Sequence, residues 1–162
     1  GVGVFVNEGF AAIMERVGRC GLQGEQLHGR ETPELVHRLL HEGLTVVKAV
    51  YVNGAPSLSQ AASFGASAYL VECAGGVLPG GNAQQWDWGV ALDFSSHYPT
   101  LLAGGLNPEN VIQAIAAASP DAVDVSSGVE AVPGRKDLDK VKRFLEAVSQ
   151  TRCSRRLRRI FE

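Results

Sequence analysis

The sequence lacks the features of membrane-spanning, secreted and disordered proteins. In its 162 residues no apolar run approaches the ~18 residues that a membrane span requires, and no charged and apolar leader precedes the first strand-like segment. With 45% apolar and 20% charged residues, the composition is typical of one globular domain with a buried core. We therefore expect a cytoplasmic protein with no membrane partner.

Cysteine is too scarce and too irregularly spaced for a disulfide framework or a structural zinc site. Cys20, Cys73 and Cys153 show no Cys-x-x-Cys pair and no Cys/His ligand spacing. His37 and His41 stand four residues apart, but without a HExxH glutamate a solvated helix face explains them better than a metal site. We expect reduced thiols and no metal.

Positive charge is scarce outside the C-terminus. Five of the 15 basic residues are arginines in the last eleven positions, which leaves the preceding 151 residues with a formal charge of −6. Such an acidic body does not attract nucleic acid, so no nucleic-acid partner is expected. We expect the basic tail, residues 150–162, to be frayed and solvated, because like-charged termini are usually disordered; contact with an anionic surface is the alternative.

Six short apolar or β-branched runs recur along the chain at nearly constant spacing. Equivalent positions in successive runs are 22 residues apart, except for one interval of 32. Helix-like stretches separate them, which indicates repeated βα units with parallel strands. The runs span Val2–Val6, Gly24–Leu27, Thr45–Tyr51, Ala68–Glu72, Thr100–Ala103 and Ala122–Val125.

Both an α/β barrel and an open doubly wound sheet satisfy this pattern. No Gly-x-Gly-x-x-Gly motif follows the first run, so the sequence does not support a dinucleotide-binding Rossmann fold. Glycine-rich loops follow the later strands, as in (β/α)8 barrels, whose active sites are built from such loops. We predict an α/β fold of the (β/α)8 TIM-barrel type. A complete barrel needs ~250 residues, so residues 1–149 are expected to form an incomplete barrel of about six βα units whose open strand edges favour self-association or pairing with another segment.

Two glycine- and serine-rich loops follow the last two strands, where barrel enzymes often bind a substrate phosphate. The first contains Gly104 and Gly105, and the second contains Ser126, Ser127 and Gly128. Backbone N–H groups, serine hydroxyls and the N-termini of following helices would all attract an anion. Either loop alone is explained by a tight turn, but the pair on adjacent strands favours phosphate binding.

A carboxylate flanked by two tryptophans follows the longest loop. Desolvation by Trp86 and Trp88 would raise the pKa of Asp87 and make it a usable general acid near neutrality. Asp87 is equally suited to be the N-cap of a helix that begins at Trp88, and spacing alone does not decide between the two.

The sequence from Val2 nearly to Val148 resembles the phosphoribosylanthranilate isomerases of tryptophan biosynthesis. Their fold is the TIM barrel, and related phosphate-binding barrels share the glycine loops but not the combination of the last two motifs. The resemblance is carried by VGVFVN at 2–7, QLHG at 26–29, Lys48-Ala49, the 80–82 loop leading to WDW at 86–88, LAGGLNPENV at 102–111 and DVSSGVE at 124–130.

The resemblance implies an Amadori rearrangement without cofactor or metal. The family converts the phosphosugar N-(5-phosphoribosyl)anthranilate to 1-(2-carboxyphenylamino)-1-deoxyribulose 5-phosphate. Asp87 matches its general acid, which protonates the furanose ring oxygen, and Asp124 looks like a substrate-orienting residue, with a buried structural carboxylate as the alternative. The positions that match the phosphate cradle are Gly104, Gly105, Ser126, Ser127 and Gly128.

The sequence also departs from the family. The family's cysteine base lies in a Lys-Ile-Cys-Gly segment of its first strand, and neither this segment nor a substrate-binding arginine of its second strand occurs here. Glu72 stands where the family more often has an aspartate. We expect a chain without the first two βα units and with negligible turnover by itself. The alternatives are a non-catalytic phosphate-binding partial barrel, and another phosphosugar isomerase or epimerase, which would not explain the Trp-Asp-Trp acid.

Overall fold

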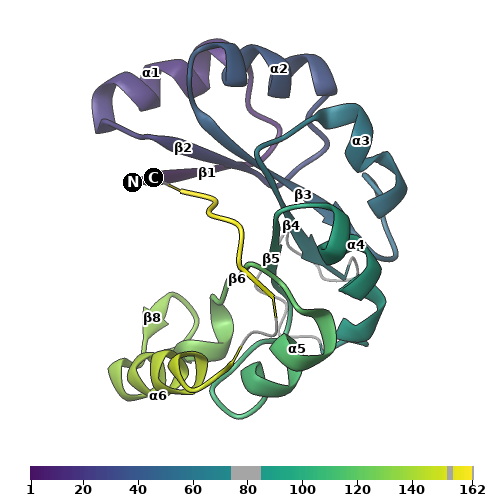
Figure 1. Cartoon of the computed structure of the whole chain (residues 1–162). Helices are drawn as coiled ribbons and strands as arrows, with labels where there is room; N and C mark the ends of the chain where they lie inside the picture. The colour runs from purple at the N-terminus through teal and green to yellow at the C-terminus, as the bar shows by residue number, and fades with distance from the viewer. Residues whose placement is uncertain (74–84, 153–154, 162) are drawn as a thin grey trace.

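The computed structural model describes residues 1–73, 85–152 and 155–161. Six parallel strands lie in one sheet in the order of the sequence, and the sheet curls into half of a barrel with the helices on its outer side (Figure 1). The strands are β1 (Val2–Phe5), β2 (Gly24–Leu27), β3 (Thr45–Tyr51), β4 (Ala68–Glu72), β5 (Thr100–Leu102) and β6 (Ala122–Val123).

Amphipathic helices connect the strands. They are α1 (Phe10–Cys20), α2 (Pro33–His41), the 3-10 turn η1 (Leu58–Gln60) with α3 (Ala61–Phe64), η2 (Trp88–Ala91) with α4 (Leu92–His97), α5 (Val111–Ala118) and α6 (Leu138–Ser149). Local signals set their ends: Thr32 caps α2 ahead of Pro33, and Asp137 caps α6. Gly21 ends α1 in the left-handed conformation, which glycine adopts without steric cost.

Residues alternate between the two faces of the sheet. One set packs under the helices in the main core, which includes Val46, Val50 and Tyr69. The other set forms a smaller apolar cluster on the concave inner face, contributed by Val47, Ala49, Ala68, Leu70, Leu101 and Ala103. Both faces of the central strands β3 and β4 are therefore buried, which explains why their sequences are mostly apolar and do not alternate with polar residues.

All six expected strands form, and the structure adds elements that periodicity did not indicate. A short antiparallel hairpin joins β7 (Glu130–Val132) to β8 (Arg135–Lys136), and the 3-10 turn η3 (Ser127–Val129) precedes it. The helix expected from Pro108 begins only at Val111. The reason is local: Asn107 Oδ1 accepts the N–H groups of Glu109 and Asn110 and so closes a turn ahead of the helix.

The C-terminal tail differs from the frayed segment that its charge suggested. Residues 155–161 contain no helix or strand, but Arg155 and Arg158 pair with Asp121, whose side chain is fully buried. In Figure 1 this yellow segment runs along the inner side of the sheet and ends beside β1. Pairing with a buried carboxylate offsets the like-charge repulsion on which the expectation of disorder rested.

Glu25 on β2 is a buried acid whose two carboxylate oxygens have no hydrogen-bond partner among the described residues. Burial raises its pKa to about 7. Because the folded pKa lies above the unfolded one, folding favours the protonated form. The free energy of unfolding is therefore highest with respect to Glu25 below its unfolded pKa of about 4.3, where the acid is protonated in both states. This contribution is lost as the pH rises through 7, where the buried acid must ionise.

We expect Glu25→Gln to remove this pH dependence. The free energy of unfolding of the variant relative to the native chain should increase by about 3 kcal/mol between pH 4 and pH 8, because only the native chain must ionise a buried acid. Urea unfolding at several pH values measures the difference, with the exposed Glu15→Gln as the matched control. Parallel curves for the native chain and Glu25→Gln would contradict the assignment.

Candidate functional site

Four polar side chains gather at the carboxyl ends of the strands. His28 follows β2, Tyr51 and Glu72 end β3 and β4, and Asp124 follows β6. Alternation along each strand places them on the inner face, above the apolar cluster described above. We call these four residues the inner-face cluster. Of them, only Asp124 was expected as a site residue from the sequence.

His28 and Glu72 form the centre of this cluster. His28 Nε2 lies 3.3 Å from Glu72 Oε2, and each side chain is only 7% exposed, although the ring N–H is not aligned for a hydrogen bond. The Gln26 amide lies 3.1 Å from His28 Nδ1, so with the amide donating to Nδ1 the ring proton is on Nε2, facing Glu72. Tyr51 donates its hydroxyl to the His28 carbonyl oxygen at 3.0 Å. These contacts hold the His28 ring and its main chain in place beside Glu72.

Charge within the cluster changes the acidity of its members. Burial raises the pKa of Asp124 and the Glu72 charge raises it further, while His28 and Lys136 act in the opposite direction. Burial, followed by the charges of Glu72 and Glu31, raises the pKa of Tyr51 to about 12, so the phenol stays protonated. A buried carboxyl group whose pKa is raised above its ordinary value is a candidate for proton exchange with a substrate.

The two glycine-rich loops pack directly against each other at this same edge of the sheet. A Cβ atom on Gly128 would collide with the Leu106 carbonyl oxygen, so only glycine permits the approach. Gly104 and Gly105 have φ values of 85° and 68°. Among the described residues, the N–H groups of Gly104, Gly105 and Ser126 take part in no backbone hydrogen bond. They remain available to an anion.

Lys136 on β8 ties the hairpin to the second loop. Its ammonium group donates to the Ser126 carbonyl oxygen at 2.8 Å and to Glu130 Oε1 at 2.9 Å. The expected helix after this loop is only the three-residue turn η3, because the chain turns at once into β7. The helix N-terminus expected there is therefore absent, and the cation beside this loop is Lys136, which is paired with Glu130.

Asp87 is not desolvated by its neighbours, so that expectation was wrong. Asp87 is exposed, and its Oδ1 accepts the N–H of Gly89 at 3.0 Å as the N-cap of η2. The indole groups point elsewhere: Trp86 donates to the Ala103 carbonyl oxygen at 3.1 Å and Trp88 to that of Gly104 at 3.3 Å. The N-cap interpretation is confirmed, and the two indoles anchor Asp87 beside the first glycine loop.

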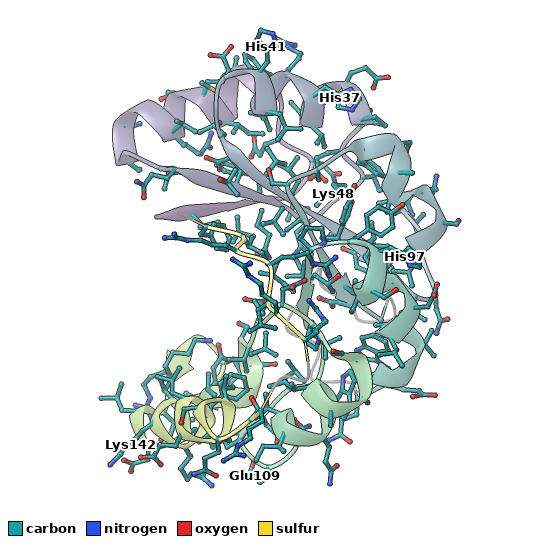
Figure 2. All side chains as sticks on the ribbon, in the orientation of Figure 1. His37, His41, Lys48, His97, Glu109 and Lys142 are labelled. Carbon is teal, nitrogen blue, oxygen red and sulfur yellow. The ribbon has the colours of Figure 1, made fainter. Side chains whose placement is uncertain are left out.

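The remaining candidates from the sequence lie away from the cluster or outside the described residues. His37 and His41 are exposed on the outer side of α2, as expected of a solvated face (Figure 2). The 80–82 motif falls in the part of the chain that is not described. Across residues 1–73, 85–152 and 155–161, no three His, Cys, Asp or Glu side chains are grouped so as to hold a metal ion, and no helix is long and apolar enough to cross a membrane.

Comparison with known proteins gives one consistent result. The family model for N-(5'-phosphoribosyl)anthranilate (PRA) isomerase matches residues 1–147. The N-(5'-phosphoribosyl)anthranilate isomerase of Desulfatibacillum aliphaticivorans is 52% identical over 160 residues, which cover 99% of this chain and 73% of the relative. The crystal structure of the Thermotoga maritima enzyme is 38% identical, with a TM-score of 0.81 over 93% of this chain and 73% of that one.

A further solved PRA isomerase, in complex with reduced 1-(o-carboxyphenylamino)-1-deoxyribulose 5-phosphate, is 37% identical, with a TM-score of 0.74 over 93% of this chain and 71% of that one. The half-barrel fold, the packed glycine-rich loops and these similarities agree with one another. The chain belongs to the N-(5'-phosphoribosyl)anthranilate isomerase family, whose members are intramolecular isomerases of tryptophan biosynthesis.

Proposed function

We propose that this chain binds N-(5-phosphoribosyl)anthranilate and supplies the phosphate-binding and proton-donating part of its Amadori rearrangement. The observation that carries the proposal is the direct packing of the second glycine loop on Leu106, at the sheet edge where the inner-face cluster lies. A phosphosugar whose phosphate is held by the loops can extend its ring over that cluster. The complex of the solved relative with a carboxyphenylamino-deoxyribulose phosphate supports this class of ligand.

The phosphate would be bound by backbone N–H groups and hydroxyls rather than by arginines. Three of these N–H groups have no backbone acceptor among the described residues, and Lys136 adds positive charge beside the second loop. Such a concave arrangement of N–H groups is a common anion site. The residues assigned to this cradle are Gly104, Gly105, Ser126, Ser127 and Gly128.

The general acid must protonate the furanose ring oxygen so that the ring opens. Asp87 is the candidate from the sequence, and it is exposed next to the first glycine loop. The geometry favours Glu72, which is buried in the inner-face cluster 3.3 Å from His28, on the face over which the sugar ring would lie. Asp124 would orient the substrate from β6.

The base that removes the C2′ proton is the missing part. The resemblance assigns it to a cysteine in a Lys-Ile-Cys-Gly segment, which does not occur in these 162 residues. Loss of one acid or base costs about 10²–10⁴-fold in rate. We therefore expect negligible turnover from this chain alone. A phosphate-binding half-barrel without catalysis is the second candidate.

Complementation tests the proposal. Turnover of phosphoribosylanthranilate, followed by its loss of fluorescence, is measured with and without a separate polypeptide that carries the family's first two βα units. We expect activity only when both polypeptides are present. Activity of the chain alone would contradict the assignment of the base. A folded mixture that binds phosphate but has no turnover would favour the non-catalytic half-barrel.

Open strand edges would provide the contact for such a polypeptide. Among the described residues, β1 pairs only with β2 and β6 only with β5. Val4 on β1 is 63% exposed. We propose that this edge pairs with a barrel-completing segment or with a second copy, in line with the dimeric Thermotoga enzyme. A cytoplasmic location, with no nucleic-acid or membrane partner, fits a biosynthetic enzyme and stays a prediction.

A further inference from the structure

A buried carboxylate lies at the base of the sheet, at the opposite end of the strands from the glycine-rich loops. Asp121 comes directly before β6, and its side chain is fully buried. Its Oδ2 accepts the N–H of Thr100, the first residue of β5, at 3.0 Å. Asp121 thus joins the beginnings of two strands whose other ends carry the glycine-rich loops.

Two arginines of the C-terminal tail bind this carboxylate. Arg155 donates to Oδ1 at 2.7 Å, and the Arg158 guanidinium donates to Oδ2 at 2.8 Å while its backbone N–H donates to Oδ1 at 2.8 Å. A guanidinium group has five donors in a fixed plane, so each arginine can also reach main-chain acceptors. Those acceptors are the carbonyl oxygens of Ser95, Tyr98 and Ser119.

We propose that Asp121 and these three carbonyl groups form a binding site for arginine, which the chain's own tail fills, so that residues 155–161 act as a strap across the base of the half-barrel. Beyond Arg158 the strap continues along the inner side of the sheet. Ile160 packs against the inner apolar cluster, and Phe161 lies against Gly24 at the start of β2. Figure 1 shows this segment ending beside β1.

The strap is distinct from the part of the chain that defines the family. The family model ends at residue 147, eight residues before Arg155, whereas the Desulfatibacillum relative aligns over 160 residues. Three of the tail arginines differ in their contacts. Arg155 and Arg158 bind Asp121, whereas the Arg156 side chain makes no hydrogen bond or ion pair among the described residues.

The acidity of Asp121 is consistent with this site. Burial alone raises its pKa, but hydrogen bonds from Arg155, Arg158 and the Thr100 N–H outweigh burial and lower the pKa to about 2. Because the folded pKa lies below the unfolded value, the strap's contribution to stability is present above about pH 4 and is lost as the pH falls toward 2.

Limited trypsin digestion of the full chain tests the strap. Mass spectrometry measures the rate of cleavage after Arg159. We expect Arg155→Ala/Arg158→Ala to be cleaved at least about tenfold faster than the native chain, because cleavage of a bound tail requires it to open first. Arg156→Ala is the matched control and should behave as the native chain does. Arg158→Lys keeps the charge but not the planar fork, so its rate should lie between the two.

A second measurement compares the thermal stability of the same variants at different pH values. The thermal midpoint of the double variant should lie below that of Arg156→Ala at pH 7, and the difference should vanish as the pH falls toward 2. Equal cleavage of the native chain, Arg156→Ala and the double variant would overturn the proposal, as would a midpoint difference that does not change with pH. Neither measurement uses substrate, so their outcome is independent of the proposed function.

Discussion

In the complemented enzyme, Glu72→Gln is expected to lower the turnover of phosphoribosylanthranilate by about 10²–10⁴-fold, the effect of losing one general acid. Glutamine has the shape of glutamate but no proton of comparable acidity. Glu72 is 5% exposed and lies 3.3 Å from His28 in the inner-face cluster, so bulk water has little access to the position from which it would donate. The readout is kcat under saturating substrate.

Asp87→Asn is the matched control, because asparagine caps a helix as well as aspartate does and only the acid is removed. We expect its turnover to stay within a few-fold of the native value. A loss of about 10²-fold or more in Asp87→Asn with near-native Glu72→Gln would return the general acid to Asp87. Phosphate binding by both variants, measured by calorimetry, confirms that the glycine-rich loops are intact.

Lys48→Met is expected to destabilise the fold strongly, by about 3–5 kcal/mol in the free energy of unfolding. Lys48 is fully buried on β3 and lies 3.0 Å from Glu31, whose side chain is 1% exposed. The ammonium also donates to the carbonyl oxygens of Leu27, Gly29 and Ala49. Without it Glu31 would be a buried charge with no cation, which is why the cost exceeds that of lost packing.

Two comparisons test this explanation by urea unfolding. Adding Glu31→Gln to Lys48→Met removes the uncompensated charge and should restore part of the stability. Lys142→Met breaks an ion pair with Glu146 on the outer side of α6, where both side chains are mostly exposed, and should change stability by no more than about 0.5 kcal/mol (Figure 2). Equal losses in the free energy of unfolding for Lys48→Met and Lys142→Met would show that the buried ion pair stabilises the fold no more than an exposed one.

The βα repeat and the family were determined by the sequence alone. Short segments bounded by turn residues and repeated every 22 residues predicted β2, β3 and β4 with the bounds that the structure has, because each βα unit of the repeat has nearly the same length. The glycine-rich motifs were equally readable. Gly128 must be glycine because a Cβ atom there would collide with the Leu106 carbonyl oxygen. A requirement of this kind fixes the residue type at one position, so it can be recognised in the sequence as a motif.

Only the tertiary structure decided which polar groups meet and which charges are buried. His28 and Glu72 are 44 positions apart, and Asp121 and Arg158 are 37 apart; nothing in their local sequence marks either pair. The tail illustrates the reason. Counting charge along the chain treats neighbouring arginines as mutually repulsive. Their free energy in the fold depends instead on the Asp121 carboxylate, which precedes β6, and on carbonyl oxygens at the C-terminal ends of α4 and α5.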